Sequence, residues 1–407
     1  MPVTFKHATL PNGLTIVAEV DPDAHSAAAG FFVRTGARDE PSPVMGVSHF
    51  LEHMMFKGTH DLTAEEINRG FDELGARNNA YTSHEMTVFY AHTLPEKLTP
   101  GVDLLARMMR PALRQEDFDT EKGVILEEIA MYKDEPFWVL YEAASERHFT
   151  PHPLGHRVLG TEETIRDLTS SQMRAYFESR YSADNTTLAL AGNLDFDRIV
   201  DQVGELCRAW QTTRPIRDAA RPATNAQRFV MRDAKVSRAY ILALADAPSV
   251  QDQRRYAASL LMQILGGADN SRLHWALIET GIAEQAQASF DPRDGCGEYF
   301  IFAAGDPARH EEIWDIVERQ VADLKDSLTE WDLERLRAKY ATSLTVGSER
   351  PADRMQRLGR IWTSLHEYRT LESELERINA VTLDDLRTLL DAFPLSRRTV
   401  GILLPQD

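Results

Sequence analysis

Two histidines and a glutamate lie close together near the start of the chain, in the stretch His49-Phe50-Leu51-Glu52-His53. On a helix, residues four apart project from the same face, so the imidazoles of His49 and His53 point the same way. Two imidazoles at this spacing can hold one divalent cation, and a carboxylate beside them can take a proton from a water molecule on that cation. The spacing therefore predicts a metal site with Glu52 as the proton acceptor.

The residues around this motif are apolar on nearly every side, which indicates a buried helix. They are Val47, Phe50, Leu51, Met54, Met55 and Phe56. Ionisable groups buried there need partners, because an unpaired buried charge is costly. A core helix whose histidines hydrogen-bond to the backbone is the alternative to a metal site. Three ionisable groups in register within five residues favour the metal site. Ser42 is the expected N-cap of this helix, with Pro43 at its first position.

A catalytic zinc ion usually has three protein ligands and one open position, so a third ligand must come from elsewhere. Residues 120–132 read as a helix with one largely apolar stripe. The stripe contains Glu121, Val124, Ile125, Glu128, Ile129 and Tyr132. A carboxylate on the apolar side, such as that of Glu128, requires a cation. Glu127 is turned away by about 100° at helical pitch. Glu121, two turns before Glu128, is placed to hydrogen-bond a metal ligand from behind.

These motifs resemble those of the pitrilysin-type (M16) zinc peptidases, whose H-x-x-E-H order is the inverzincin signature. Within that family the chain is most similar to the short branch of mitochondrial-processing-peptidase-like proteins, and it looks like the zinc-bearing subunit of a heteromeric bacterial enzyme. Further matching stretches are Asn12 to Leu14, Asn79 to Thr82, His152 to Gly155, Gly160-Thr161 and Leu265 to Gly267. The resemblance implies that His49, His53 and Glu128 bind zinc and that Glu52 is the base.

The resemblance also implies a reaction and a substrate site. The reaction is endopeptidase hydrolysis of a peptide or unfolded segment inside a chamber formed by two chains. Zinc polarises the scissile carbonyl, while Glu52 takes a proton from the water and passes it to the leaving amine. The peptide is expected to pair as an added strand with the edge strand that contains Asn79, Ala80 and Tyr81. An ordinary protected edge strand is the alternative at that position.

The second half of the chain departs from the family pattern at two positions. Active members carry an arginine and a tyrosine after Gly-Gly-x-x-x-Ser-Arg-Leu, where they hold the substrate carbonyl. Here Gly266-Gly267 and Ser271 to Leu273 are present, but Ile278 and Glu284 occupy the two positions. Neither isoleucine nor an ionised glutamate can donate a hydrogen bond. The resemblance therefore implies a heterodimer in which a homologous zinc-less chain supplies the arginine and tyrosine. A homodimer, with a shifted alignment or another substituting residue, is the alternative.

The order of predicted elements is the same in both halves of the chain: strand, helix pair, strand, long helices and a closing strand. This repetition indicates an α+β fold of two homologous α/β-roll units, each an antiparallel-rich sheet covered by helices. The length of 407 residues suits two domains of about 200 residues each. We expect a zinc-binding catalytic domain at 1–212, a proline-containing linker at 213–227 and a homologous domain without metal at 228–407.

The composition narrows the class of protein. A hydrophobic content of 43% with 27% charged residues is typical of a globular protein. The net charge of −18 argues against nucleic acid or an anionic membrane as the main partner. No apolar run approaches the ~18–20 residues of a spanning helix, and the start lacks a signal-peptide layout. We therefore expect a cytoplasmic location, or a periplasmic one if a leader has been removed. Cys207 and Cys296 are expected to be unpaired.

Two other functions are compatible with such a fold. One is a structural subunit like the core proteins of respiratory complexes, which lack the intact motif. The complete set of His49, Glu52, His53 and Glu128 argues against that role. The other is a peptide-binding module with a purely structural zinc ion. A structural site is normally closed by a fourth protein ligand, and Glu52 would then have no role.

Overall fold

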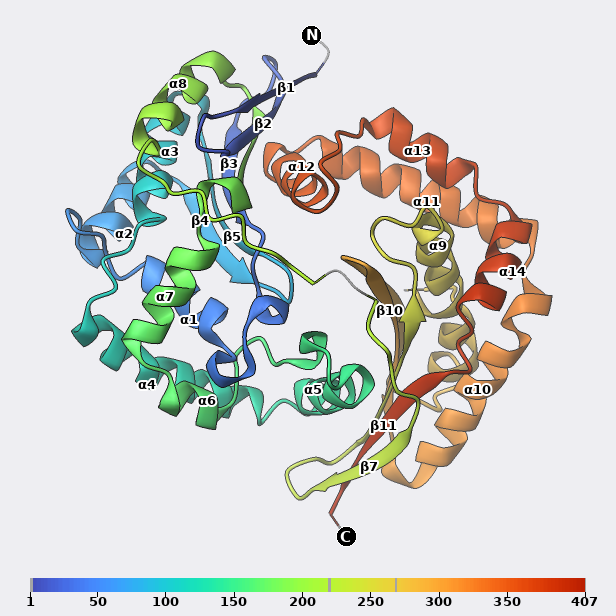
Figure 1. Cartoon of the computed structure of the whole chain (residues 1–407). Helices are drawn as coiled ribbons and strands as arrows, with labels where there is room; N and C mark the ends of the chain where they lie inside the picture. Colours follow the sequence, from blue (N-terminus) through green and yellow to red (C-terminus); the bar gives the residue numbers. More distant parts are fainter. Residues whose placement is uncertain (1–2, 219–220, 268, 407) are drawn as a thin grey trace. The chain divides into compact units, whose positions relative to one another are not determined.

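The computed structural model describes residues 3–218, 221–267 and 269–406. It divides the chain into two compact units, whose elements are labelled in Figure 1. The first unit comprises Met1–Ile129, His156–Asp218 and Leu344–Arg369. The second comprises Ala130–Gly155, Ala219–Ser343 and Thr370–Asp407. Each unit is built on one β-sheet, so the fold is the expected mixture of helices and two sheets.

The sheet of the first unit has six strands in the order β1-β2-β6-β3-β5-β4. Their bounds are Thr4–Thr9 (β1), Thr15–Val20 (β2), Ala27–Val33 (β3), Arg77–Thr82 (β4), Thr87–Thr93 (β5) and Thr186–Gly192 (β6). All neighbours are antiparallel except β2 and β6, which are parallel. Strands β3 and β6 are buried along their whole length at the centre of the sheet. Strand β4 forms one edge.

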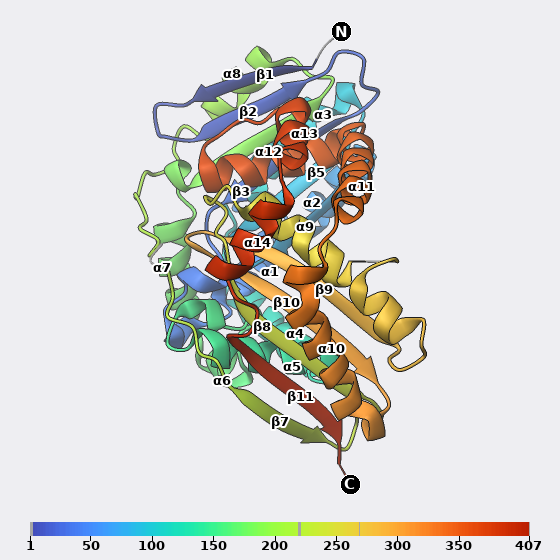
Figure 2. The same ribbon diagram turned by 90° about the vertical axis from the view of Figure 1, so that its right-hand side faces the viewer.

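The sheet of the second unit has five strands in the order β7-β11-β8-β10-β9, and Figure 2 shows them running side by side. Their bounds are Arg228–Asp233 (β7), Ala239–Ala247 (β8), Gln285–Arg293 (β9), Cys296–Gly305 (β10) and Arg398–Pro405 (β11). Only β7 and β11 are parallel neighbours. With β1 set aside, both sheets place the first, last, second, fourth and third strands of their unit in the same spatial order. This shared topology confirms the prediction of two homologous units.

Most helices of the first unit pack against its sheet around one apolar core that includes Phe31, Phe50 and Phe118. Their bounds are Val47–Met55 (α1), Ala64–Glu73 (α2), Leu98–Met108 (α3), Gln115–Tyr132 (α4), Glu162–Asp167 (α6), Ser170–Arg180 (α7), Phe196–Leu206 (α8) and Pro351–Leu365 (α12). Helix α12 instead contributes Met355 to a separate cluster around Phe32. Helix α4 runs on past the unit boundary at Ile129. In the middle of this set, α1 lies against β4, β5 and α7, which brings the histidine motif to the strands at the sheet edge.

The helices of the second unit surround the second sheet in a similar way. Their bounds are Pro136–Phe149 (α5), Arg255–Gly266 (α9), His310–Ser327 (α10), Glu330–Ser348 (α11), Leu371–Asn379 (α13) and Leu383–Ala392 (α14). A single π-helical turn spans His274–Ile278. Among the described residues, no helix of either unit is long and apolar enough to cross a membrane. Cys207 and Cys296 are both buried and are not joined to each other by a disulfide bond.

Each unit contains one helix that comes from the other half of the chain. Helix α5 packs on β8 and β11, and α12 packs on β2, β3 and β6. Because β3 corresponds to β8 and β6 to β11, the two exchanged helices cover equivalent strands. The units therefore differ from the contiguous domains expected at 1–212 and 228–407. The boundary after Asp218 falls inside the expected linker, but 130–155 belong to the second unit and 344–369 to the first.

The beginning of the expected linker at 213–227 is fixed to the first unit. The guanidinium of Arg217 donates from Nε to Oδ1 of Asp39 at 2.9 Å and from Nη2 to Oδ2 at 2.6 Å. The backbone N–H groups of Thr213 and Arg214 donate to the carboxylate of Asp184. Residues 213–218 are thus a bound segment of the first unit and not a free spacer.

Candidate metal centre

Helix α1 carries the histidine motif and begins at Val47, later than the Ser42 cap predicted from the sequence. The prediction was wrong because Ser42 begins only a short 3-10 turn that ends at Val44. The carboxyl group of Glu40 caps α1 instead, accepting hydrogen bonds from the N–H groups of Gly46 at 2.7 Å and Ser48 at 2.8 Å. This buried residue satisfies two backbone donors that a helix N-terminus leaves free.

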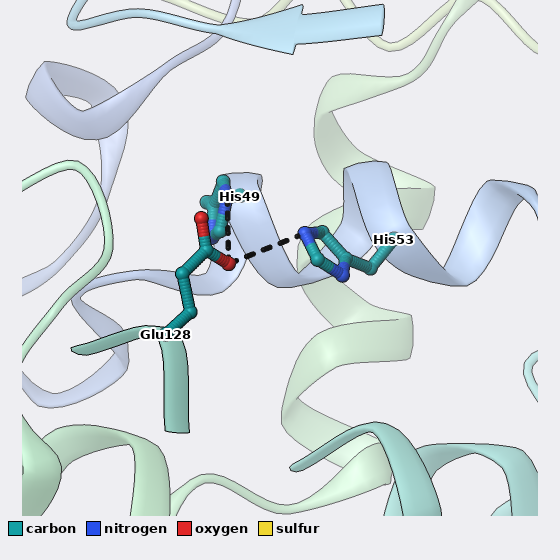
Figure 3. A group of neighbouring side chains, drawn as sticks. All are labelled: His49, His53 and Glu128. Atoms are coloured by element: carbon teal, nitrogen blue, oxygen red, sulfur yellow. Dashed lines mark ion pairs between the residues drawn. The ribbon is translucent and has the colours of Figure 1, made fainter. Parts of the chain in front are cut away.

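The side chains of His49, His53 and Glu128 converge, as Figure 3 shows. Their ligand atoms all lie within 4.8 Å of one another. Oε2 of Glu128 is 3.7 Å from Nε2 of His49 and 3.6 Å from Nε2 of His53. Two atoms bound tetrahedrally to one zinc ion lie about 3.3–3.6 Å apart, given bonds of ~2.0–2.2 Å. The two distances from the carboxylate to the imidazoles, and the types of the three donor atoms, therefore fit a single zinc ion.

The protonation of these groups also suits a cation. Burial, helped by the charge of nearby His53, lowers the pKa of His49 to about 3. The imidazole of His49 is therefore neutral at physiological pH, which is the state that binds a metal ion. Burial raises the pKa of Glu128. A cation between these side chains would favour the ionised carboxylate and offset that effect.

Glu121 lies behind His53, as the helix phase predicted. Its Oε1 is 2.8 Å from Nδ1 of His53, and its Oε2 is 2.5 Å from Nζ of Lys57. Burial opposes ionisation of Glu121, but the hydrogen bonds and charges of His53 and Lys57 lower its pKa overall. An ionised Glu121 accepts the Nδ1 proton of His53, which leaves Nε2 free for a metal ion. The sequence analysis gave no role to Lys57, which stands four residues after His53, just beyond the end of α1.

Glu52 lies beside the three converging side chains but is not one of them. Its Oε2 accepts a 2.6 Å hydrogen bond from Oγ1 of Thr82, and its Oε1 has no hydrogen-bond partner among the described residues. Burial raises the pKa of Glu52, although the hydrogen bond from Thr82 opposes this. A carboxylate with a raised pKa and one free oxygen is suited to accept a proton and release it. The sequence analysis did not predict this contact of Thr82 either.

The predicted substrate residues lie on strand β4, an edge of the first sheet. Asn79 accepts a 2.9 Å hydrogen bond from the N–H of Ala80 through its side-chain oxygen. The hydroxyl of Tyr81 donates to Oε1 of Gln356 at 3.1 Å. The same strand ends at Thr82, so the edge of the sheet runs directly to the carboxylate of Glu52.

The two positions at which the second half departs from the family pattern, Ile278 and Glu284, both lie in the second unit. Ile278 is the last residue of the π-helical turn and is partly buried. Glu284 forms a 2.7 Å ion pair with Nε of Arg238. Neither position presents the arginine or tyrosine donor that the family pattern carries there.

Comparison with known sequences identifies the family. Residues 15–162 match the family described as "Insulinase (Peptidase family M16)", and residues 167–340 match "Peptidase M16 inactive domain". An "uncharacterized zinc protease" of Mycobacterium leprae is 32% identical over 98% of this chain and 91% of its own length. The chain belongs to peptidase family M16. The M16 relative named "uncharacterized zinc protease YmxG", from Bacillus subtilis, is 30% identical over 95% of this chain and 94% of its own.

Solved structures of M16 proteins have the same fold. A protease from Helicobacter pylori superimposes with a TM-score of 0.92 at 19% identity, covering 99% of this chain and 100% of its own. A structure titled as the peptidase M16 inactive domain from Pseudomonas fluorescens also reaches 0.92 at 19% identity, covering 100% and 98%. The M16 resemblance seen in the sequence is thus confirmed. These relatives are named zinc proteases, which agrees with the zinc cofactor expected from the sequence.

Proposed function

We propose that this M16 protein is a zinc endopeptidase in which His49, His53 and Glu128 bind the metal ion and Glu52 is the general base. The observation that supports this most directly is the position of Glu52. It lies next to the three converging ligand atoms, is not part of that set, and keeps one oxygen free. Zinc bound to the three ligands supplies a Lewis acid that polarises a carbonyl group and lowers the pKa of a bound water molecule.

The side chains of the chain itself have separate tasks in this proposal. Glu52 accepts a proton through its free Oε1 and later donates it to the leaving amine. Thr82 holds Oε2 and so fixes the direction in which the carboxylate faces. Glu121 and Lys57 hold the imidazole of His53 from behind. Each of these contacts keeps a reacting or binding group in place before the substrate arrives.

The substrate we propose is an extended peptide or an unfolded segment of a protein. Strand β4 is a sheet edge, and an extended chain can add to such an edge through backbone hydrogen bonds. Asn79, Ala80 and Tyr81 lie along this edge and would contact the residues of the peptide nearest the scissile bond. Strand addition requires little from the side chains of the peptide, so a broad sequence preference is expected.

We further propose that the active assembly is a chamber formed with a homologous zinc-less chain. Ile278 and Glu284 stand where the M16 pattern has an arginine and a tyrosine, and Glu284 is already paired with Arg238. Neither of these two residues can donate a hydrogen bond to the oxygen of the scissile carbonyl as charge develops on it. A partner that carries both residues would supply that stabilisation.

The test uses the purified full chain and an unstructured fluorogenic peptide. Wild type and Glu52→Gln are both expected to contain one zinc ion. When each is mixed with a homologous zinc-less chain, only wild type should hydrolyse the peptide. Glu127→Gln is the matched control, because Glu127 is exposed on the same helix as Glu128. Loss of zinc from Glu52→Gln would contradict the assignment of Glu52 as base and not ligand.

The heterodimer is tested separately by mixing. The chain alone is expected to show little hydrolysis, and addition of a homologous zinc-less chain that contains the arginine and tyrosine should restore it. Full turnover by the chain alone, unchanged by such a partner, would exclude the heterodimer. That result would leave the zinc peptidase assignment intact.

A further inference from the structure

A small hollow with a mainly apolar lining lies in the first unit, and none of its residues belongs to the metal centre. It has a volume of about 210 Å³ and lies where the loop after α1 meets the C-terminal ends of α3 and α8. Its wall combines apolar side chains with cationic and hydrogen-bonding ones. Among these residues are Thr59, His60, Arg107, Arg110, Leu206 and Trp210.

Arg110 is a largely buried cation without an anionic partner among the described residues. Its Nη1 donates a 2.7 Å hydrogen bond to the carbonyl oxygen of Met109, and its Cζ lies 3.6 Å from the centre of the Trp210 ring. Nε and Nη2 make no hydrogen bond to any described residue, and neither atom is sealed from solvent. Burial lowers the pKa of Arg110 to about 10, as expected for a guanidinium that lacks a negative neighbour. At neutral pH the group is still a cation.

The other charges of the hollow do not neutralise Arg110. Asp61 is already bound, because its Oδ2 accepts a 2.5 Å hydrogen bond from Arg107 and its Oδ1 accepts one from Thr59. Arg107 also lies 3.7 Å from Asp103. The lining therefore contains two guanidinium groups and one carboxylate. With Arg107 held between Asp61 and Asp103, Arg110 is the cation of this lining that no carboxylate of the described residues neutralises.

We propose that this hollow binds a small oxyanion, of the phosphate or carboxylate class, through the free N–H groups of Arg110. The planar guanidinium presents parallel donors that match two oxygens of such a group. Stacking on Trp210 fixes the plane of the guanidinium in advance, which reduces the entropy lost on binding. The apolar side chains of Leu206 and Trp210 leave room for a short hydrocarbon part beside the anion. The site is independent of the proposed peptidase reaction.

The experiment follows the melting temperature of the full chain while inorganic phosphate or N-acetylleucine is added against sodium chloride at equal ionic strength. Wild type is expected to show a saturable rise of about 1–3 °C at ten times the dissociation constant. Arg110→Met, which keeps the hydrocarbon stem on Trp210, should lose this rise. Arg208→Met is the matched control, because Arg208 is exposed on the same segment and does not line the hollow. It changes the net charge equally and should retain the rise.

A second variant distinguishes a loss of the anion site from a folding defect in Arg110→Met. Asp61→Asn removes the only carboxylate of the lining, so it should tighten anion binding by about three- to tenfold. A misfolded protein cannot produce that gain. If phosphate binds more tightly than N-acetylleucine, a free anion is indicated as the ligand. If N-acetylleucine binds more tightly than phosphate, the carboxylate end of a peptide is indicated. Absence of a saturable response beyond that to chloride in wild type, or an equal response in Arg110→Met, would overturn the proposal.

Discussion

Oγ1 of Thr82 donates a 2.6 Å hydrogen bond to Oε2 of Glu52. The two residues come from different elements, since Thr82 ends strand β4 and Glu52 lies in helix α1. Through this bond, the edge strand proposed to bind the peptide is tied to the proposed base. A peptide that adds to β4 therefore meets a carboxylate whose orientation depends on the same strand.

Replacing Thr82 by valine should slow the reaction without removing the metal ion. Valine has a similar shape but cannot donate the hydrogen bond, so the carboxylate of Glu52 becomes free to rotate. We expect kcat in the active assembly to fall roughly tenfold or more, since a hydrogen bond to a charged group contributes about 1.5–3 kcal/mol. KM and zinc content should stay near their wild-type values. Thr82→Ser should keep most of the activity, and a wild-type kcat in Thr82→Val would refute the role of this bond.

The three glutamates of helix α4 should differ in their effect on zinc affinity. Glu128→Gln removes a proposed ligand and is expected to lower the affinity most. Glu121→Gln removes the carboxylate behind His53 and should lower it by about 10–100-fold. Glu127→Gln should leave it unchanged, because that side chain is exposed. Competition with a zinc-binding dye measures all three variants. A metal-free Glu127→Gln protein beside a zinc-loaded Glu128→Gln protein would show that the helix is read in the wrong register.

Arg217 should contribute strongly to the stability of the first unit despite its place in the expected linker. Its side chain and that of Asp39 are 5% and 1% exposed. Breaking a buried pair by removing one partner costs about 3–5 kcal/mol. We therefore expect Arg217→Met to lower the free energy of unfolding by roughly that amount in urea titrations. Arg214→Met is the control, because Arg214 is exposed and its side chain has no partner among the described residues. Equal stability of the two variants would contradict the prediction.

Asp246 should make the stability of the second unit depend on pH in the acid range. Burial opposes ionisation of Asp246, but the imidazole of His148, 3.6 Å away, and the hydrogen bond from Thr224 lower its pKa overall. The charge of Arg221 acts in the same direction. The pKa in the folded protein therefore lies below the ordinary value of 3.8. The stabilisation is fully present above that ordinary value and is lost as the pH falls through the lower folded pKa.

The variant Asp246→Asn measures this contribution. At pH 6 it should be less stable than wild type by about 1 kcal/mol, the usual net contribution of a hydrogen bond. Below pH 4 the difference should shrink, because wild type loses the contribution while the variant has none to lose. Urea unfolding at pH 6 and pH 3 provides the comparison. A difference that stays constant between the two pH values would exclude Asp246 as its source.

Local patterns predicted the parts of the site that depend on helix geometry. The spacing of His49 and His53 was sufficient to place both imidazoles on one face, and the helix phase separated Glu128 from exposed Glu127. Helix phase alone did not predict the burial of Val124, which was assigned to the apolar stripe but is 44% exposed. The position of a residue on a helical stripe predicts only the direction of its side chain. The element packed against the helix determines whether that side chain is buried.

The contacts that the sequence did not reveal depend on how separate segments pack against one another. Thr82 is 30 positions from Glu52, and no periodicity connects a strand residue to a helical carboxylate. Glu40 replaced the expected Ser42 cap because an irregular segment placed its carboxyl group at the helix end. The sequence also did not predict that α5 and α12 each pack on the sheet formed by the other half of the chain. The apolar face of a helix shows that it packs on something, but not on which sheet.

The exchanged helices affect whether the duplicated halves can exist apart. The backbone passes between the units after residues 129, 155, 218, 343 and 369. Residues 1–212 alone would lack α12, leaving Phe32 without its contacts to Met355 and Leu358. Residues 228–407 alone would lack α5, leaving part of the second core open. The two homologous halves of the chain therefore depend on each other for folding. A protease nick within 213–227 is therefore expected to leave a protein whose two fragments stay together until it is denatured.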